Sequence, residues 1–270
     1  MTITGNLPTA TAHQIRCQVF QPTRRPGYQN KSIATSWGTA NVEGRLGQTH
    51  ADTIEAMMYH AEKSRITEGG RLQILVDPHK VRMSVGGGKQ YSYSQIWKVL
   101  LKDLKKAVVE VHNPKMGIKA MGSIIDEVVE SPAERVNPLT GKQRHLWRVT
   151  LGPAWTQLIQ EDLALYYDPM PIARLSNGVS QAVARHVLTH RREPQGGWKL
   201  EELLHSVGAA GRTRDRRNEL IEDAVDLAKL GIEINGDRVN RIEKRDQLPG
   251  VRDQLPGNAT SCPAVPVLSV

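Results

Sequence analysis

Apolar side chains recur at helical spacing in several segments of the chain. Residues 51–63 place Ile54, Met57, Met58 and Ala61 on one side of a helix. Residues 92–109 begin with a Ser-x-x-Gln capping box, and their apolar face is formed by Ile96, Trp97, Leu100, Leu101, Leu104 and Val108. Further helices are predicted over residues 153–165, 176–190, 198–208 and 211–230. In the last of these, the residues expected to face the core are Leu220, Ile221, Ala224, Val225, Leu227 and Ala228.

Short apolar runs between these helices predict strands. The runs are "RLQILVD" at residues 71–77, "KVRMSV" at 80–85, and two segments at 122–129 and 145–151. About 15 residues join the last two segments, and they include several basic side chains, so a hairpin with a long basic tip is expected. Asn235-Gly236 predicts a tight hairpin within residues 231–242.

The order of elements in the second half is characteristic. A short helix, a "GAAG" turn, a helix that starts with basic residues and a tight hairpin follow one another, as in a winged helix-turn-helix. The first half shows a second version of this plan. The fold class predicted is therefore α+β, mainly helical, with two tandem winged helix-turn-helix domains, β-hairpin wings and flexible tails.

The polar ends of the chain complete the predicted domain organisation. A flexible N-terminal arm is expected over residues 1–32, a first winged-helix domain over 33–168 and a second, DNA-binding winged-helix domain over 169–245. Residues 246–270 carry a tandem "DQLPG" duplication with Pro and Gly in each copy, which is typical of a disordered tail.

Charge narrows the class of partner. The chain has 270 residues, a formal net charge of +8 and a sequence pI of about 9.6, which favour a polyanionic partner. The sequence shows neither an apolar run long enough for a membrane span nor a signal core, so a cytoplasmic protein without a membrane partner is expected. The two cysteines, Cys17 and Cys262, lie in segments interpreted as tails and suggest no metal pair.

The stretch "GRTRDRRNEL" carries the main DNA-binding hypothesis. Arginine suits bidentate contacts with guanine and phosphate, asparagine can read adenine, and a helix N-terminus attracts phosphate. The competing interpretation is a solvated charged face, and Asp215 within the run is evidence for it. The predicted contacts are Arg212, Thr213, Arg214, Arg216, Arg217 and Asn218.

A second basic surface is predicted in the first half. The polar face of the helix over residues 92–109 carries four lysines, which suit phosphate contacts better than base reading. An ordinary amphipathic helix with a solvated lysine face explains the same pattern. The further predicted DNA contacts are Lys98, Lys102, Lys105, Lys106, Lys142, Arg144 and Arg238.

Three other motifs do not support catalysis. "VGGGKQ" lacks the spacing of a phosphate-binding P-loop, and His186 and His190 have no third metal ligand evident in the sequence. Tyr166-Tyr167 is not accompanied by the His-x-His of a metal-dependent nicking enzyme. Only 4% of the residues are aromatic, so few side chains are available for stacking against the bases of single-stranded DNA. The sequence therefore predicts no catalytic residue, no metal and no cofactor, and a protein that is not an enzyme.

One segment carries a family resemblance. "RLSNGVSQAVARHVLTHRREPQGGWKLEELLHSVGA", with the Arg-rich helix after it, resembles the C-terminal winged helix of plasmid replication initiators of the TrfA type. "SWGTANVEGRLGQTHADTIEAMMYHAEKSR" is similar to the start of that family's first winged helix, so the resemblance covers about residues 33–243.

The resemblance implies a plasmid function. It implies binding to direct repeats (iterons) in duplex DNA at a plasmid origin, opening of nearby AT-rich DNA, and recruitment of the host replication initiator and replicative helicase. It also implies a monomer that is active in initiation and a homodimer that is inactive or represses its own gene, which would control copy number.

Two alternatives remain open at this point. A transcriptional repressor would use the same DNA chemistry on an inverted repeat, read by a stable two-fold dimer. A nicking replication enzyme would form a covalent adduct with DNA in the presence of Mg²⁺ or Mn²⁺.

Overall fold

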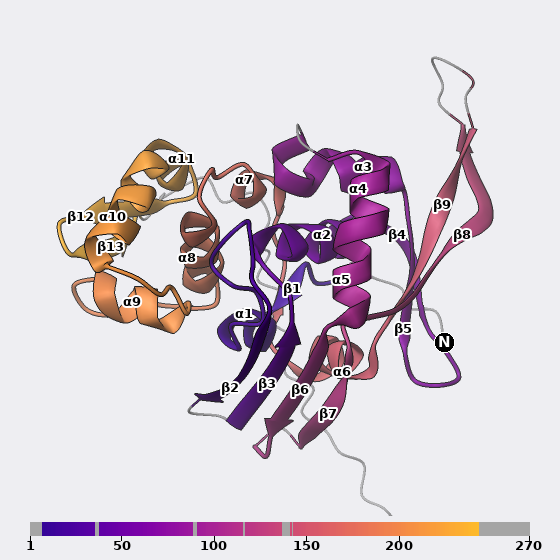
Figure 1. The fold of residues 1–270 in the computed structure, drawn as a ribbon, viewed down its shortest axis with the longest axis horizontal. Coiled ribbons are helices and arrows are strands. Elements are labelled where there is room, and N and C mark those ends of the chain that lie inside the picture. The colour runs from indigo at the N-terminus through magenta and orange to yellow at the C-terminus, as the bar shows by residue number, and fades with distance from the viewer. Residues whose placement is uncertain are drawn as a thin grey trace, which may run out of the picture.

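The computed structural model describes residues 7–35, 38–88, 91–115, 117–136, 141 and 143–242. About 39% of this part of the chain is helix and about 32% is strand, so the fold is mixed α/β (Figure 1). No helix in the described part of the chain is long and apolar enough to cross a membrane. The tail predicted over residues 246–270 and its "DQLPG" duplication lie outside the described residues.

Two four-stranded antiparallel sheets build the first half. Their strand orders are β2-β3-β6-β7 and β4-β5-β9-β8. In chain order the elements are β1 (Ala10–Thr11), α1 (Ala12–Arg16), β2 (Gln29–Thr35), β3 (Gly38–Gly44), α2 (Gln48–Tyr59), β4 (Ala61–Ile66), β5 (Leu72–Val76), α3 (Pro78–Ser84), the short turn η1 (Val85–Gly88), α4 (Tyr93–Gln95), the π-helical turn η2 (Ile96–Leu100), α5 (Leu101–Lys106), β6 (Val108–Asn113), β7 (Ile118–Ser123), β8 (Ile125–Val136), β9 (Gln143–Leu151), α6 (Pro153–Glu161) and β10 (Ala164–Leu165).

The structure departs from the prediction of a mainly helical fold, because strands make up almost as much of the described chain as helices, and the first of these sheets accounts for part of the difference. In β3 the buried apolar residues are Ala40 and Val42, and polar residues or glycine occupy the positions around them. Such a strand has too few apolar residues to stand out as a period-2 pattern. Val108 was assigned to the preceding helix, whereas it begins β6, a strand that pairs with β3 and β7.

The segment "KVRMSV" was also assigned wrongly, because it is helical and not a strand. It lies in α3, where the Asp77 carboxylate accepts a hydrogen bond of 2.8 Å from the backbone N–H of His79. Pro78 occupies the first turn, where its missing N–H costs nothing. This Asp-Pro start signal outweighs a short run of alternating residues.

The N-terminal segment differs from the flexible arm predicted over residues 1–32. From residue 7 onward it is packed on the body: β1 pairs with β10, and Cys17 and Val19 are fully buried. Burial raises the pKa of the Cys17 thiol, so this cysteine is an inert core residue. The sequence signal was absent because single apolar residues, rather than a periodic set, provide the anchors.

The second half surrounds its own apolar cluster. Its elements are α7 (Met170–Ala173), α8 (Gly178–Leu188), β11 (Trp198–Lys199), α9 (Leu200–Ser206), α10 (Thr213–Glu222), α11 (Ala224–Lys229), β12 (Ile232–Asn235) and β13 (Arg238–Arg241). The three strands form an antiparallel sheet of order β11-β13-β12, and β12 and β13 are the hairpin predicted at Asn235-Gly236. Gly236 has the positive φ of 60° that this turn requires.

The helix predicted over residues 211–230 is interrupted at Asp223. Leu220 and Leu227 are fully buried, as expected for its core face. Ile221 and Val225 are 51% and 73% exposed, although both were predicted to face inward. Asp223, between α10 and α11, has a non-helical backbone conformation, so the periodicity of one continuous helix no longer applies across it.

Candidate nucleic-acid interface

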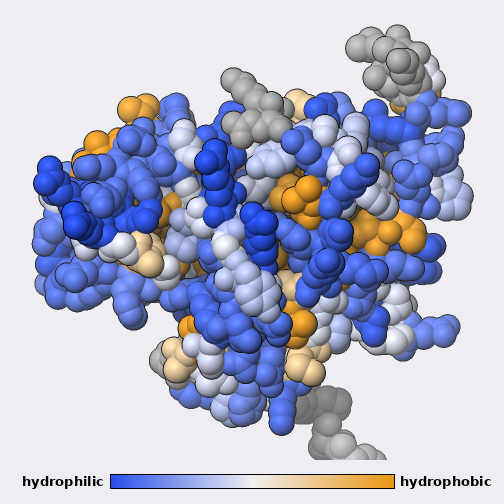
Figure 2. Space-filling view, viewed as in Figure 1, coloured by the Kyte–Doolittle hydropathy of each residue, from blue (hydrophilic) through white to orange (hydrophobic). Residues whose placement is uncertain are grey.

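The N-terminal turns of α10 present a basic, exposed surface. Arg212 occupies the position before the first turn, and Arg214, Arg217 and Asn218 are exposed on the helix together with Thr213. The unpaired N–H groups at this helix end add positive potential to that of the guanidinium groups. Five of the six residues predicted here are therefore available for contact with an anion. Figure 2 shows strongly hydrophilic residues at the end of the molecule that carries α10.

Arg216, the sixth predicted contact, is engaged by neighbouring groups of the protein. It is half-buried, and its Nε donates a hydrogen bond of 2.8 Å to the carbonyl oxygen of Ala210. Its Nη1 donates one of 2.6 Å to the Glu219 carboxylate. This arginine holds the turn before α10 against the helix, so its role is to position its neighbours.

The buried carboxylate of Asp223 fixes α10 to α8. Its two oxygens each accept a hydrogen bond of 2.9 Å, one from the N–H of Ser176 and one from the N–H of Asn177. The Asn177 side-chain amide donates to the Glu219 carbonyl oxygen at 3.0 Å. Ser176 had been predicted as the cap of the helix over residues 176–190, whereas Asn177 is the N-cap residue and Asp223 satisfies its N–H.

The lysine face predicted in the first half is present on η2 and α5. Lys98, Lys102, Lys105 and Lys106 are exposed, and the opposite side of the helix is anchored by Ile96, Leu100, Leu101 and Leu104. Trp97 and Val108 depart from the predicted apolar face, because they are 38% and 39% exposed. The four lysines therefore form a row along the side of a helix that lies on the body of the protein.

The basic side chains predicted on the two hairpins differ from these lysines. Arg144 donates two hydrogen bonds, of 2.9 and 2.6 Å, to the Asp77 carboxylate that caps α3. Burial raises the pKa of Asp77, but the hydrogen bonds from Arg144 and from the His79 N–H outweigh it and hold the pKa below its usual value. Arg238 donates to the carbonyl oxygens of Gly196 and Gly197 at 3.1 and 3.4 Å. Lys142 lies outside the described residues.

Two exposed arginines that the sequence did not single out are Arg25 and Arg45. Arg25 belongs to the loop from α1 to β2, which Figure 1 shows between α8 and α2. Arg45 donates a hydrogen bond of 2.8 Å to the Pro26 carbonyl oxygen of the same loop. Figure 2 shows strongly hydrophilic residues across the middle of this face as well. The only sequence signal was the dipeptide Arg24-Arg25 in a segment interpreted as an arm.

The motifs that suggested chemistry have structural environments. Two glycines of "VGGGKQ" have positive φ, and a Cβ at Gly87 would lie 2.9 Å from Arg174, so a tight turn needs glycine there. The ring nitrogens of His186 and His190 are 3.1 Å apart, and burial together with His190 lowers the pKa of His186 to about 4. Among the described residues, no group of three or more His, Cys, Asp or Glu side chains could hold a metal ion.

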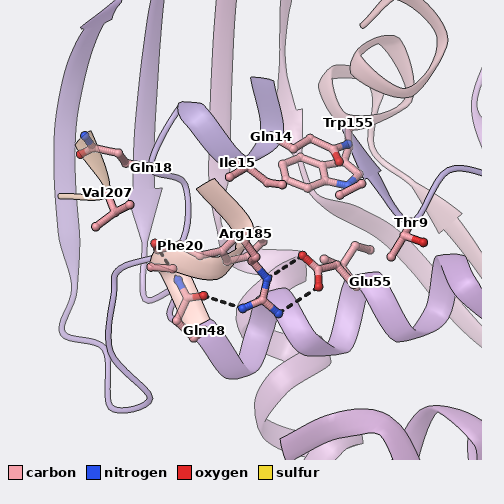
Figure 3. A pocket seen from close by; sticks show the side chains of 13 residues that line it. Thr9, Gln14, Ile15, Gln18, Phe20, Gln48, Glu55, Trp155, Arg185 and Val207 are labelled. Carbon is pink, nitrogen blue, oxygen red and sulfur yellow. Dashed lines mark hydrogen bonds and ion pairs between the residues drawn. The ribbon is translucent and has the colours of Figure 1, made fainter. Parts of the chain in front are cut away.

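Tyr167 is packed against the core of the second half and is a poor candidate for a nucleophile. Burial, together with the charge of Glu55, raises its pKa well above the usual value, while Tyr166 is 52% exposed. The small pocket beside this region holds about 30 Å³ and is lined by Gln48, Glu55 and Arg185 among others (Figure 3). Such a volume suits a water molecule.

Comparison with known proteins relates the fold of this chain to solved protein structures. No protein-family model and no curated protein matches the chain, so membership of the TrfA-type family stays a prediction. Among solved structures, the chain is similar to a selenomethionine derivative of domains 2 and 3 of RctB, with a TM-score of 0.51 and 12% identity over 85% of this chain and 95% of that one. A second structure of RctB domains 2 and 3 has a TM-score of 0.43 and 14% identity, over 82% of this chain and 84% of that one. The chain therefore shares its overall fold with domains 2 and 3 of RctB.

Proposed function

We propose that this protein is a replication initiator that binds duplex DNA with both halves and reads sequence with α10. The observation that carries the proposal is the contrast along α10. Its first turns expose Arg212, Arg214 and Arg217, while its last turns are fixed to the core by Leu220 and followed by Asp223. A helix held in this way presents a basic end that fits the major groove.

The proposal includes a winged helix in each half. In the second half the order α8, β11, α9, α10–α11, β12 and β13, with β11 paired to β13, supports it. In the first half, α2, α3 and the lysine helix precede the long β8–β9 hairpin, which supports a related arrangement with an additional four-stranded sheet. The domain boundaries at residues 33, 168 and 245 are part of the same proposal.

The role at a plasmid origin rests on the sequence resemblance over residues 33–243. Under it, the protein binds direct repeats, promotes opening of the origin and recruits the host initiator and helicase, without catalysing a reaction itself. The fold shared with RctB domains 2 and 3 extends over 85% of the chain, which supports treating both halves as parts of one functional unit.

The test is a footprint of the purified protein on DNA that flanks its own gene. Evenly spaced protection over direct repeats, each about two helical turns long, is the result expected of an origin-binding initiator. Protection of one inverted repeat at the promoter would instead identify a repressor. Incubation of supercoiled plasmid with Mg²⁺ or Mn²⁺ gives no covalent protein–DNA adduct if the proposal holds, and an adduct would establish a nicking enzyme.

A further inference from the structure

A buried ionic cluster joins the two halves. Arg185 of α8 is 3% exposed, and three side chains of α2 accept hydrogen bonds from it; Figure 3 shows two of them, Gln48 and Glu55. Its Nε donates to Glu55 at 2.7 Å, its Nη2 to Asp52 at 2.6 Å and its Nη1 to Gln48 at 2.6 Å. The planar guanidinium group satisfies three acceptors at once, so the orientation of α8 relative to α2 is defined in more than one direction.

A strap from the N-terminal segment makes a second connection across the same junction. Arg16 donates to the side-chain and backbone oxygens of Thr189 at 2.9 and 2.7 Å. The Gln18 amide donates to the carbonyl oxygens of His205 and Ser206 at 3.2 and 3.0 Å, at the end of α9. We call residues 16–24 the strap.

The strap packs closely against two glycines of the second half. A Cβ at Gly178, the first residue of α8, would lie 2.5 Å from the backbone of Thr23. At Gly208, after α9, it would lie 2.5 Å from the Gln18 side-chain oxygen. Real Cβ atoms do not approach backbone atoms so closely, so the contact at Gly178 needs glycine. The Gln18 side chain could move, but Gly208 needs glycine because its φ is +71°.

Both candidate DNA contacts are attached to this junction. On one side, Asp223 ties α10 to the start of α8. On the other side, His50 of α2 lies 3.5 Å from Asp103, which is part of the lysine helix. A continuous series of contacts therefore runs from the lysine helix through α2 and α8 to α10.

We propose that the Arg185 cluster and the strap hold the α10 arginines and the η2–α5 lysines at one fixed offset along the duplex. This inference rests on the proposed function. A rigid junction lets the lysines contact only the phosphates at that offset from the bases read by α10. A flexible linker would instead spread the lysines over many phosphates, because each base pair advances the backbone by about 3.4 Å.

The first test needs no DNA. Spin labels are placed at Val99→Cys and Val225→Cys, two exposed positions in the two halves, in a chain that also carries Cys262→Ser. Pulsed electron paramagnetic resonance is expected to give one narrow distance distribution. The strap variant Arg16→Ala/Gln18→Ala is expected to broaden it. The neutral cluster variant Asp52→Asn/Glu55→Gln/Arg185→Gln is expected to broaden it further.

Lys199→Ala is the matched control, since it removes an exposed ion pair with Glu202 away from the junction. It is expected to leave the distribution unchanged. A broad distribution in the unmodified junction would overturn the inference. A distance distribution that stays narrow in a strap variant with a native circular dichroism spectrum would also overturn the inference.

The second test is ethylation interference on the footprinted duplex. With the native junction, interference by the lysine helix is expected at a single group of phosphates, at a constant offset from the bases protected by α10. With the strap variant, the interference is expected to be weaker and spread over more phosphates. A wide pattern in the native protein would overturn the inference and leave DNA binding intact. Failure to footprint any duplex would overturn the proposed function and, with it, the fixed offset on DNA. The spin-label experiment would still show separately whether the junction is rigid.

Discussion

The two basic helices present similar charge in different ways. On α10 the arginines gather at the helix start, where Arg214 and Arg217 are exposed beyond the anchored Leu220. On η2 and α5 the lysines form a row along a helix whose whole opposite side is buried. A helix end can enter a groove, whereas a helix side that lies on the body can only lie along the backbone. Anchoring, more than charge, therefore separates the expected roles.

The largest effect is expected where both helices lose their common support. Arg185→Met removes the cation that is hydrogen-bonded to Asp52 and Glu55 in the buried cluster. The free energy of unfolding is expected to fall by about 3–5 kcal/mol, because a buried carboxylate without its partner pays an uncompensated desolvation cost. Urea denaturation measures this.

The control for Arg185→Met replaces the whole cluster. Arg185→Met with Asp52→Leu and Glu55→Met removes all three charges and is expected to recover most of the loss. If Arg185→Met alone left the urea midpoint unchanged, the cluster would not be what joins the halves.

A pH dependence is expected for the second half. The pKa of His186 is lowered to about 4 by burial and by His190, so between pH 6.5 and 4 the unfolded chain binds a proton that the folded protein does not. The free energy of unfolding is therefore highest above pH 6.5 and falls as the pH drops towards 4, by roughly 3 kcal/mol in total. Thermal melts across this range measure it. His186→Gln should flatten the profile, and an equally steep profile would assign the dependence to other groups.

The comparison between the helices predicts different mutant phenotypes. Arg214→Ala or Arg217→Ala is expected to cost about 1–3 kcal/mol on the cognate site and to relax sequence preference, since a bidentate base contact is lost. Binding titrations on cognate and scrambled duplexes measure this. Arg192→Ala removes the same charge from an exposed position outside α10 and serves as the control. Unchanged specificity in both α10 variants would remove this helix from the interface.

The smallest effect is expected on the lysine row. Lys102→Ala should weaken binding to all duplexes alike. A plot of log binding constant against log salt concentration should become less steep by about 0.9, the contribution of one phosphate contact. Lys63, an exposed lysine on β4, provides the matched Lys63→Ala control. A loss confined to one sequence would show that this helix reads bases.

Local signals in the sequence identified two features of the second half. Asn235-Gly236 identified its hairpin, and the run of arginines before Leu220 identified the start of α10. These features depend on residues close together in the chain, namely a turn, a helix start and an apolar face. In the first half, Asp77-Pro78 carried a comparable signal for α3 that a short alternating run obscured.

The sequence by itself determined which residues are basic and which helices bear them. It could not determine which of these side chains are exposed, because folding brings distant groups to Arg144 and Arg238. Arg144 meets a carboxylate 67 positions away, and Arg238 meets carbonyls more than 40 positions away. The four-stranded sheet of β2, β3, β6 and β7 and the Arg185 junction were likewise decided by tertiary structure. The pairing of β3 with β6 and the contacts of Arg185 with α2 join segments far apart in the chain, and no local period records them.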